Sequence, residues 1–170
     1  MLMGITTKDQ VGIVILNYNT YDKTIKLIQK LQQQSVVEKL VVVVVDNCSP
    51  NDSFKLLQPY SKQYKNVTVL QTDKNLGYAR GNNFGLAFLE KKIKPKYITI
   101  LNNDVKISND CFEKLIDKYQ VLNKPAIIAP VMLSMSGDRL IPPRLNSFID
   151  DCVSLFIVLN KYYSRNKQKE

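Results

Sequence analysis

A nearly unbroken run of valines at residues 39–45 (KLVVVVV) constrains this chain more than any other feature. Apolar side chains at consecutive positions, rather than at alternate ones, are typical of a strand that is covered on both faces, as in a parallel sheet. Valine also favours strands because its branched side chain packs well on a pleated surface. The run therefore predicts a central strand with helices on both sides of its sheet.

The rest of the chain alternates between strand-like and helix-like segments. Short apolar runs predict further strands at residues 11–16, 67–71, 97–101 and about 126–133. Apolar residues at helical spacing predict helices at residues 22–34, about 52–63, from the 72–77 loop to about residue 94, and about 109–122. Asp22 is expected to cap the first of these helices. This alternation predicts an α/β fold with a doubly wound, mostly parallel sheet flanked by helices.

The pattern changes after residue 133. Residues 136–138 (SGD) predict a turn, two consecutive prolines interrupt any regular element, and residues 148–163 have the spacing of an amphipathic helix. We therefore expect one compact domain at residues 1–133, followed by a tail at residues 134–170.

The composition excludes several kinds of site. The chain contains no histidine, so it cannot build a Ser-His-Asp triad or a histidine-ligated zinc site. Three widely spaced cysteines indicate free thiols in a reducing compartment rather than a disulfide framework. The excess of 24 Lys and Arg over 15 Asp and Glu, a net charge of +9, indicates an anionic partner without identifying it.

The hydropathy pattern contains no signal-peptide core and no apolar run that approaches the roughly 18–20 residues of a membrane span. We expect a cytoplasmic protein that is soluble or attached to one membrane face.

Polar residues follow each of the first four predicted strands. They are Asn17-Tyr18-Asn19, Asp46-Asn47-Cys48-Ser49, Asp73-Lys74-Asn75-Leu76-Gly77 and Asn102-Asn103-Asp104. In open parallel sheets, ligands bind outside the carboxyl ends of the strands. The sequence therefore predicts a ligand site at this edge.

Two carboxylates at this edge each allow two interpretations. Asp46 could accept hydrogen bonds from a ribose hydroxyl or a base N–H, or it could cap the helix that follows. Asp104 could bind Mg²⁺ together with substrate phosphates and a carbonyl oxygen of Asn102, or it could cap a turn.

Residues 75–85 (NLGYARGNNFG) combine glycines with one cation. Small residues, including Ala79, would let the backbone approach a ligand, and Arg80 would offer a planar cation to a phosphate. The alternative is a glycine-bearing turn before a helix. The segment is neither a Rossmann GxGxxG fingerprint nor a P-loop.

Taken in order, VGIVILNYN, VVDNCSPNDS, NLGYARGNNFG and ITILNNDV resemble the nucleotide-sugar-binding half of family 2 glycosyltransferases, particularly rhamnosyltransferase-like members, over residues 11–133. The resemblance implies a Rossmann-like GT-A fold. It also implies inverting sugar transfer from a nucleotide diphosphate-sugar donor to a glycan or lipid-linked acceptor hydroxyl in cell-surface polysaccharide or glycoconjugate synthesis. The implied cofactor is a divalent metal, Mn²⁺ or Mg²⁺.

The resemblance also implies residue roles. Asn17 and Asn19 would lie beside the nucleotide, and Asp46 would bind the base or ribose with the loop that contains Asn47 and Ser49. The donor-binding motif would comprise Asn75, Gly77, Arg80 and Asn83, with Asn103 also near the donor. The metal-binding DxD element would read Asn102-Asn103-Asp104, with Asp104 as the main ligand.

Two departures from the family pattern affect these expectations. Asn102 replaces an aspartate, which removes one negative charge from the metal site. Residues 105–170 also lack the aromatic-rich stretch and acidic motif that supply the family's general base. Asp150 and Asp151 form an acidic pair in the tail, but we expect them to be helix N-terminal charges. The alternative function is a truncated, non-catalytic nucleotide-sugar-binding or interaction module.

Basic residues gather in two further segments. Lys91, Lys92, Lys94 and Lys96 are expected on a solvated edge opposite the strand carboxyl ends. The cations after residue 160 follow the predicted last helix, which would either lie on an anionic membrane surface or pack on the sheet. The chain lacks the basic stripe with interleaved aromatic residues of a nucleic-acid-binding domain, so no nucleic-acid partner is expected.

Overall fold

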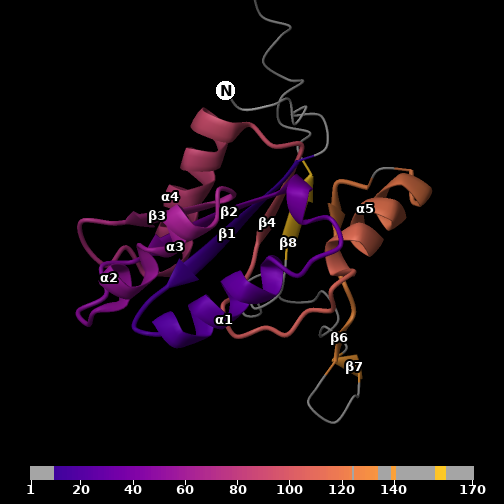
Figure 1. Ribbon diagram of the computed structural model, residues 1–170. Coiled ribbons are helices and arrows are strands. Elements are labelled where there is room, and N and C mark those ends of the chain that lie inside the picture. Colours follow the sequence, from indigo (N-terminus) through magenta and orange to yellow (C-terminus); the bar gives the residue numbers. More distant parts are fainter. Residues whose placement is uncertain (1–9, 124, 134–138, 141–155, 160–170) are drawn as a thin grey trace, which may run out of the picture.

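The computed structural model describes residues 10–123, 125–133, 139–140 and 156–159, which form a central sheet with helices on both faces (Figure 1). Four strands are parallel, and they are β1 (Val11–Asn17), β2 (Leu40–Asp46), β3 (Val67–Gln71) and β4 (Tyr97–Ile100). β1 pairs with β2 and β4, and β2 also pairs with β3. The sheet order β3-β2-β1-β4-β8-β5 confirms the predicted doubly wound, mostly parallel sheet.

The valine run forms the centre of the sheet, as predicted. Val42 and Val44 face a core that includes Leu27 and Ile28 of α1 (Tyr21–Leu31). Val43 and Val45 face a second core on the opposite side. All four side chains are fully buried. Since burial of one such side chain is worth about 1.5–3 kcal/mol, this strand contributes strongly to stability from both faces.

The helices divide between the two faces of the sheet (Figure 1). α1, α2 (Ser53–Leu57) and α5 (Cys111–Val121) contribute side chains to the core that contains Val42. α4 (Gly77–Phe88) and the π-helical turn η3 (Leu89–Ile93) cover the other face. The left-handed backbone of Lys94, with a φ of 55°, and Pro95 end this helical stretch where the sequence predicted its end.

The predicted helix at residues 52–63 is in fact two short helices, α2 and α3 (Tyr60–Gln63). Pro59 lies between them and has no N–H with which to continue the hydrogen-bond ladder of α2. The prediction that Asp22 caps α1 is also wrong. The carbonyl of Thr20 already accepts hydrogen bonds from the N–H groups of Lys23 and Thr24, which leaves Asp22 inside the first turn.

The predicted strand at residues 126–133 is two strands of two residues each, β5 (Ile127–Ile128) and β6 (Met132–Leu133). β5 joins the main sheet, whereas β6 pairs with β7 (Arg139–Leu140) in a separate two-stranded sheet. Pro130 lies between β5 and β6 and cannot donate to a strand ladder. The break at this proline explains why the two halves of the apolar segment at residues 126–133 belong to two different sheets.

The predicted amphipathic helix at residues 148–163 is wrong at its described positions. β8 (Phe156–Leu159) is a strand that runs antiparallel to both β4 and β5. A four-residue apolar run is compatible with either a helix or a strand, and here it pairs with β4. The rest of this segment, the predicted turn at 136–138, Asp150 and Asp151 lie outside the described residues, as do the basic residues after residue 160.

Candidate functional site

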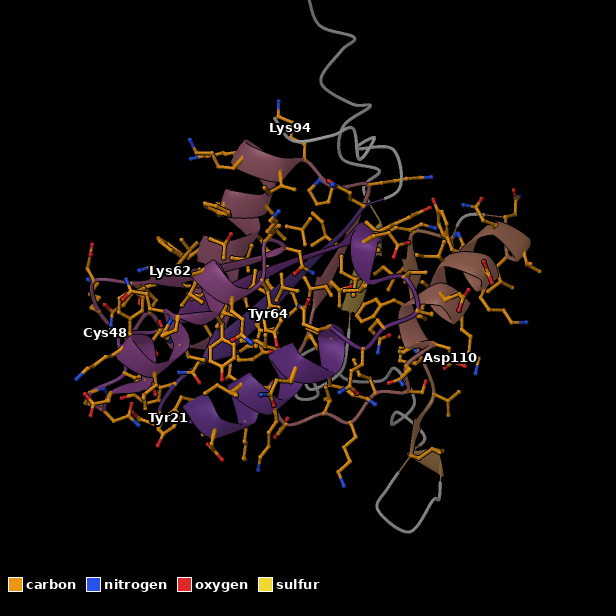
Figure 2. The ribbon with its side chains drawn as sticks, in the orientation of Figure 1. Tyr21, Cys48, Lys62, Tyr64, Lys94 and Asp110 are labelled. Atoms are coloured by element: carbon orange, nitrogen blue, oxygen red, sulfur yellow. The ribbon has the colours of Figure 1, made fainter. Side chains whose placement is uncertain are left out.

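The carboxyl ends of the parallel strands bring the predicted polar residues to one edge of the sheet. Asn17 is paired with Asp46, and Asp46 with Gln71, so the last residues of β1, β2 and β3 lie side by side. Figure 2 shows Cys48, in the loop after β2, and Tyr21, at the start of α1, far from Lys94 at the other end of the domain. Lys91, Lys92, Lys94 and Lys96 directly precede the first residue of β4, so they lie at the opposite end of the strand from this edge, as predicted.

Asp46 is the centre of this edge and is fully buried. Its Oδ1 accepts hydrogen bonds from Nδ2 of Asn17 over 2.8 Å and from Oγ of Ser49 over 2.6 Å. Its Oδ2 accepts hydrogen bonds from the N–H of Ser49 over 3.1 Å and from Nε2 of Gln71 over 3.2 Å. Four donors are a full complement for a carboxylate, and they offset the cost of burying its charge.

These bonds bear on the two interpretations of Asp46. Asp46 does not cap α2, since the N–H of Ser53 at the start of that helix donates to Oδ1 of Asn51 over 3.1 Å. Instead, Asp46 holds the turn at residues 47–49 against the ends of β1 and β3. A base or ribose group could bond to Asp46 directly only by replacing one of the four donors, and the bond from Gln71 is the longest of them.

The hydrogen-bond network continues from Asn17 to the loop after β4. Oγ1 of Thr24 donates to Oδ1 of Asn17 over 2.8 Å. Nδ2 of Asn103 donates to Oγ1 of Thr24 over 2.9 Å and to Oγ1 of Thr20 over 2.8 Å. Polar groups from the ends of β1, β2, β3 and the loop after β4 thus belong to one connected network.

Asn19 lies in the loop between β1 and α1 and has a left-handed backbone, with a φ of 61°. Its N–H donates to Oγ of Ser49 over 2.9 Å, and its carbonyl accepts from Nδ2 of Asn51 over 3.2 Å. Its side chain is exposed, and so is the neighbouring Tyr18. The structure therefore joins the β1 loop to the β2 loop and leaves the Asn19 amide accessible to a ligand.

Asn47 joins the β2 loop to the segment that leads into α4. Its Nδ2 donates to Oδ1 of Asn75 over 2.9 Å, and its Oδ1 accepts from the N–H of Leu76 over 3.0 Å. Oδ1 of Asn75 also accepts from the N–H of Gly77 over 2.8 Å. Gly77 has a φ of +73°, which glycine adopts without strain. The structure thus brings Asn47, Asn75 and Gly77 together at the start of α4.

The glycines inside α4 do not let a ligand approach the backbone, contrary to the sequence interpretation. A Cβ atom at Gly81 would lie 2.6 Å from Cδ1 of Leu16, and one at Gly85 would lie 2.6 Å from Cγ1 of Val14. Both glycines therefore allow α4 to pack closely on β1. Gly77, which is exposed, remains the glycine of this motif that is open to a ligand.

Arg80 and Asn83 are exposed on α4. Within the described part of the chain, neither side chain is hydrogen-bonded to the polar network around Asp46. Asn82, beside them, is buried instead, and its Nδ2 donates to the carbonyl of Tyr78 over 3.0 Å. Arg80 and Asn83 are therefore accessible but not fixed by the residues that organise the strand ends.

The loop after β4 carries the predicted metal ligands. Asp104 is exposed, Asn102 and Asn103 are partly buried, and Oδ1 of Asn102 accepts a hydrogen bond from the Tyr78 hydroxyl over 2.8 Å. Among the described residues, no group of three or more His, Cys, Asp or Glu side chains could hold a metal. One carboxylate and amide oxygens are hard donors that suit Mg²⁺ or Mn²⁺ when substrate phosphates complete the coordination.

Sequence reasoning missed four residues that this edge uses, namely Thr20, Thr24, Gln71 and Tyr78. Gln71 could have been found from the strand register, because it is paired with Asp46. The two threonines bond to Asn103, which is far away in the sequence, so no local sequence pattern predicts that contact.

Comparison with known proteins shows to which protein family this sheet and its polar edge belong. The sequence model of the glycosyl transferase family 2 matches residues 12–170. The chain belongs to this family. The match spans the described sheet from β1 onward and therefore contains every residue of the network around Asp46.

A relative that is a hexosyltransferase by its name agrees with this assignment. The low-salt glycan biosynthesis hexosyltransferase Agl10 of Haloferax volcanii is 29% identical over 132 residues, which cover 78% of this chain and 39% of the relative. The chain therefore spans about two fifths of that protein's length.

Solved structures show the same fold, which is of the GT-A type. Staphylococcus aureus TarS in complex with UDP is similar with a TM-score of 0.65 at 20% identity, over 78% of this chain and 38% of that chain. The mannosyltransferase PcManGT of Pyrobaculum calidifontis, in complex with GDP-Man and Mn²⁺, has a TM-score of 0.59 at 17% identity, over 75% of this chain and 36% of that chain. The GT-A fold predicted from the four family motifs is confirmed.

Proposed function

We propose that this chain binds a nucleotide diphosphate-sugar at the carboxyl edge of its sheet and serves an inverting glycosyltransferase reaction. The proposal rests on one observation: a single polar network around Asp46 joins the ends of β1, β2 and β3 and the loop after β4 in a family 2 fold. The complexes of TarS with UDP and of PcManGT with GDP-Man support a nucleotide-sugar as the ligand.

The nucleoside would lie over the β1 and β2 loops. Asn17 and Ser49 are held by Asp46, and the exposed amide of Asn19 is within the same pair of loops. Asp46 then acts mainly by fixing these loops, because its own oxygens are occupied. A base N–H that replaced the Gln71 amide would make Asp46 a direct ligand as well.

The diphosphate would lie near the start of α4. Asn47 holds Asn75 and the segment before Gly77 in place, and α4 begins at this edge, where the positive end of its helix dipole favours an anion. Arg80 and Asn83 are exposed on the first turns of α4 and would complete the contacts to the donor. A guanidinium suits this task because it can form two parallel hydrogen bonds to phosphate oxygens.

A divalent metal, Mg²⁺ or Mn²⁺, would be held by Asp104 and by an amide oxygen of Asn102. Bound there, the ion would offset the negative charge that develops on the diphosphate leaving group. Asp104 is accessible for this role, and the Tyr78 hydroxyl orients the Asn102 amide. The Mn²⁺ in the PcManGT complex supports this cofactor.

Inverting transfer also requires a base that takes the proton of the acceptor hydroxyl as its oxygen attacks the anomeric carbon. Asp46 is unsuited to this step, because it is fully buried and accepts four hydrogen bonds. Residues 105–170 also lack the acidic motif that supplies the family's base, which favours a second candidate function, in which the chain binds the donor without transferring the sugar.

The acceptor would be a glycan or a lipid-linked glycan in cell-surface polysaccharide or glycoconjugate synthesis. Agl10, by its name, acts in glycan biosynthesis, which supports this class of acceptor. Each helix in the described ranges is too short or too polar to cross a membrane. We propose a cytoplasmic location. The basic residues after residue 160 would contact the inner face of the cell membrane.

Calorimetric titration with UDP-, GDP- and dTDP-sugars, with and without Mn²⁺, tests the proposal. We expect one donor to bind more tightly with Mn²⁺, and we expect Asp104→Ala to abolish that increase. Absence of binding to all three, or an unchanged Mn²⁺ effect in Asp104→Ala, would contradict the proposal. Release of nucleoside diphosphate in the presence of a glycan acceptor distinguishes transfer from binding alone.

A further inference from the structure

Thr24 occupies a central place in the network although no family motif contains it. It lies in α1 and is fully buried. Its Oγ1 donates to Oδ1 of Asn17 over 2.8 Å and accepts from Nδ2 of Asn103 over 2.9 Å. The Thr20 carbonyl lies 3.4 Å from the same oxygen, a longer contact that competes for the single hydroxyl proton. The shorter distance assigns that proton to Asn17.

The direction of each bond in this chain follows from Asp46. An ionised carboxylate only accepts hydrogen bonds, so Asn17 must turn its NH₂ group toward Asp46 and its Oδ1 toward Thr24. Thr24 therefore gives its only proton to Asn17. Its remaining lone pairs can only accept, and they receive the NH₂ group of Asn103. The buried charge thus fixes the orientation of three side chains in sequence.

The last of these orientations concerns the predicted metal-binding loop. Both hydrogens of the Asn103 amide are used, one by Thr24 and one by Thr20. Its Oδ1 therefore points away from the two threonines, and no described residue donates to it. Asn103 is flanked by Asn102 and Asp104, so fixing its amide also restrains its neighbours in the loop.

We propose that Thr24 is a positioning residue for the loop at residues 102–104. It transmits the orientation set by Asp46 and Asn17 to Asn103, and so holds Asn102 and Asp104 ready for a metal-bound diphosphate. This inference rests on the proposed function, because it assigns the loop to metal and diphosphate. It adds a residue on α1 that touches neither ligand.

Thr99 provides a matched control. It is also fully buried, yet its Oγ1 has no hydrogen-bond partner within the described ranges. Thr24→Val removes a hydroxyl that is hydrogen-bonded to two side chains, Asn17 and Asn103, whereas Thr99→Val removes one that makes no bond to the described residues. Thr24→Ser keeps the hydroxyl and should restore the wild-type behaviour.

The first measurement needs no ligand. The side-chain amide protons of Asn103, followed by ¹H–¹⁵N NMR, should be protected from exchange in the wild type, in Thr24→Ser and in Thr99→Val. They should exchange faster in Thr24→Val. Equal exchange in the wild type and Thr24→Val would overturn the proposed positioning, whatever the chain binds.

The second measurement is the ratio of UDP or GDP dissociation constants without and with Mn²⁺. Thr24→Val should lower this ratio about five-fold, the equivalent of one lost hydrogen bond, because it should weaken binding with Mn²⁺ more than binding without it. Equal weakening with and without Mn²⁺, or no change, would overturn the inference. A wild type that binds neither nucleotide would refute the proposed function instead, and the amide exchange would then decide whether Thr24 positions Asn103.

A third variant covers the case in which Thr24→Val does not fold. Thr20→Val removes the other acceptor of the Asn103 amide and leaves Asn17 bonded to Thr24. Thr20 makes no side-chain cap bond to α1, so the substitution spares the helix start. The same faster exchange and the same loss of Mn²⁺ dependence are expected, and wild-type values for both would overturn the inference.

Discussion

The Tyr78 hydroxyl donates a hydrogen bond to Oδ1 of Asn102 over 2.8 Å and thereby joins the first turn of α4 to the loop after β4. These two elements carry the proposed diphosphate and metal contacts. Their separation is thus set by a side-chain bond as well as by the sheet. Tyr78 itself is about half exposed, at 49%, so it can also meet a ligand at this edge.

Tyr78→Phe should weaken Mn²⁺-dependent nucleotide binding more than it weakens the fold. One partly exposed hydrogen bond is worth about 0.5–1.5 kcal/mol, which corresponds to a loss of roughly two- to twelve-fold in affinity. Titration calorimetry with Mn²⁺ and urea unfolding measure the two effects separately. A large drop in unfolding free energy with unchanged binding would show that this contact serves stability alone.

Asp46→Asn should destabilise the fold by about 2–5 kcal/mol. The substitution puts an NH₂ group where a carboxylate oxygen now accepts two hydrogen bonds, as Oδ2 does from the N–H of Ser49 and Nε2 of Gln71, so two donors lose their acceptor. The matched control is Asp104→Asn, an exposed position where we expect a change within about 0.5 kcal/mol. Urea unfolding of both variants tests this contrast, and equal stabilities would be incompatible with a structural role for Asp46.

The general fold followed from the sequence because local patterns determine it. The valine run predicted a strand buried on both faces, and polar residues after each strand predicted where the ligand edge would lie. Strand register then placed Asn17 beside Asp46. The errors arose where a proline or a tertiary partner decided the outcome. Pro59 divides the helix predicted at residues 52–63, and Pro130 divides the strand predicted at residues 126–133. Residues 156–159 form a strand because they pair with β4.

The organisation of the site was harder to predict. Asp46 could be recognised as a site residue, but its four donors come from three segments whose proximity only the fold creates. The contact of Thr24 with Asn103 spans 79 positions in the sequence. The glycines of α4 illustrate the same limit, since Gly81 and Gly85, which face the sheet, cannot be told in sequence from Gly77, which is exposed.

Gly85→Ala tests the close packing of α4 on the sheet. The new methyl group would lie 2.6 Å from Cγ1 of Val14 and 2.9 Å from Cγ2 of Val45, and both valines are fully buried. Overpacking of this kind costs about 1–3 kcal/mol, which exceeds the gain of up to about 1 kcal/mol from replacing a helical glycine. We expect a lower urea midpoint.

Asn83→Ala, at an exposed position of the same helix, is the control and should leave the urea midpoint unchanged or slightly higher. If Gly85→Ala proves as stable as this control, the contact between α4 and β1 is looser than the structure indicates.

The thiol of Cys111 should react more slowly than an ordinary cysteine near pH 8. Burial raises the pKa of Cys111, and the nearby charge of Asp110 raises this pKa further, while Lys114 opposes the effect. Because the thiolate is the reactive form, a raised pKa lowers the reactive fraction at any pH below it. Iodoacetamide labelling followed by peptide mass spectrometry, with urea-unfolded protein as the reference, gives the rate. Asp110→Asn should accelerate labelling, and a folded rate equal to the unfolded rate at pH 8 would refute the raised pKa.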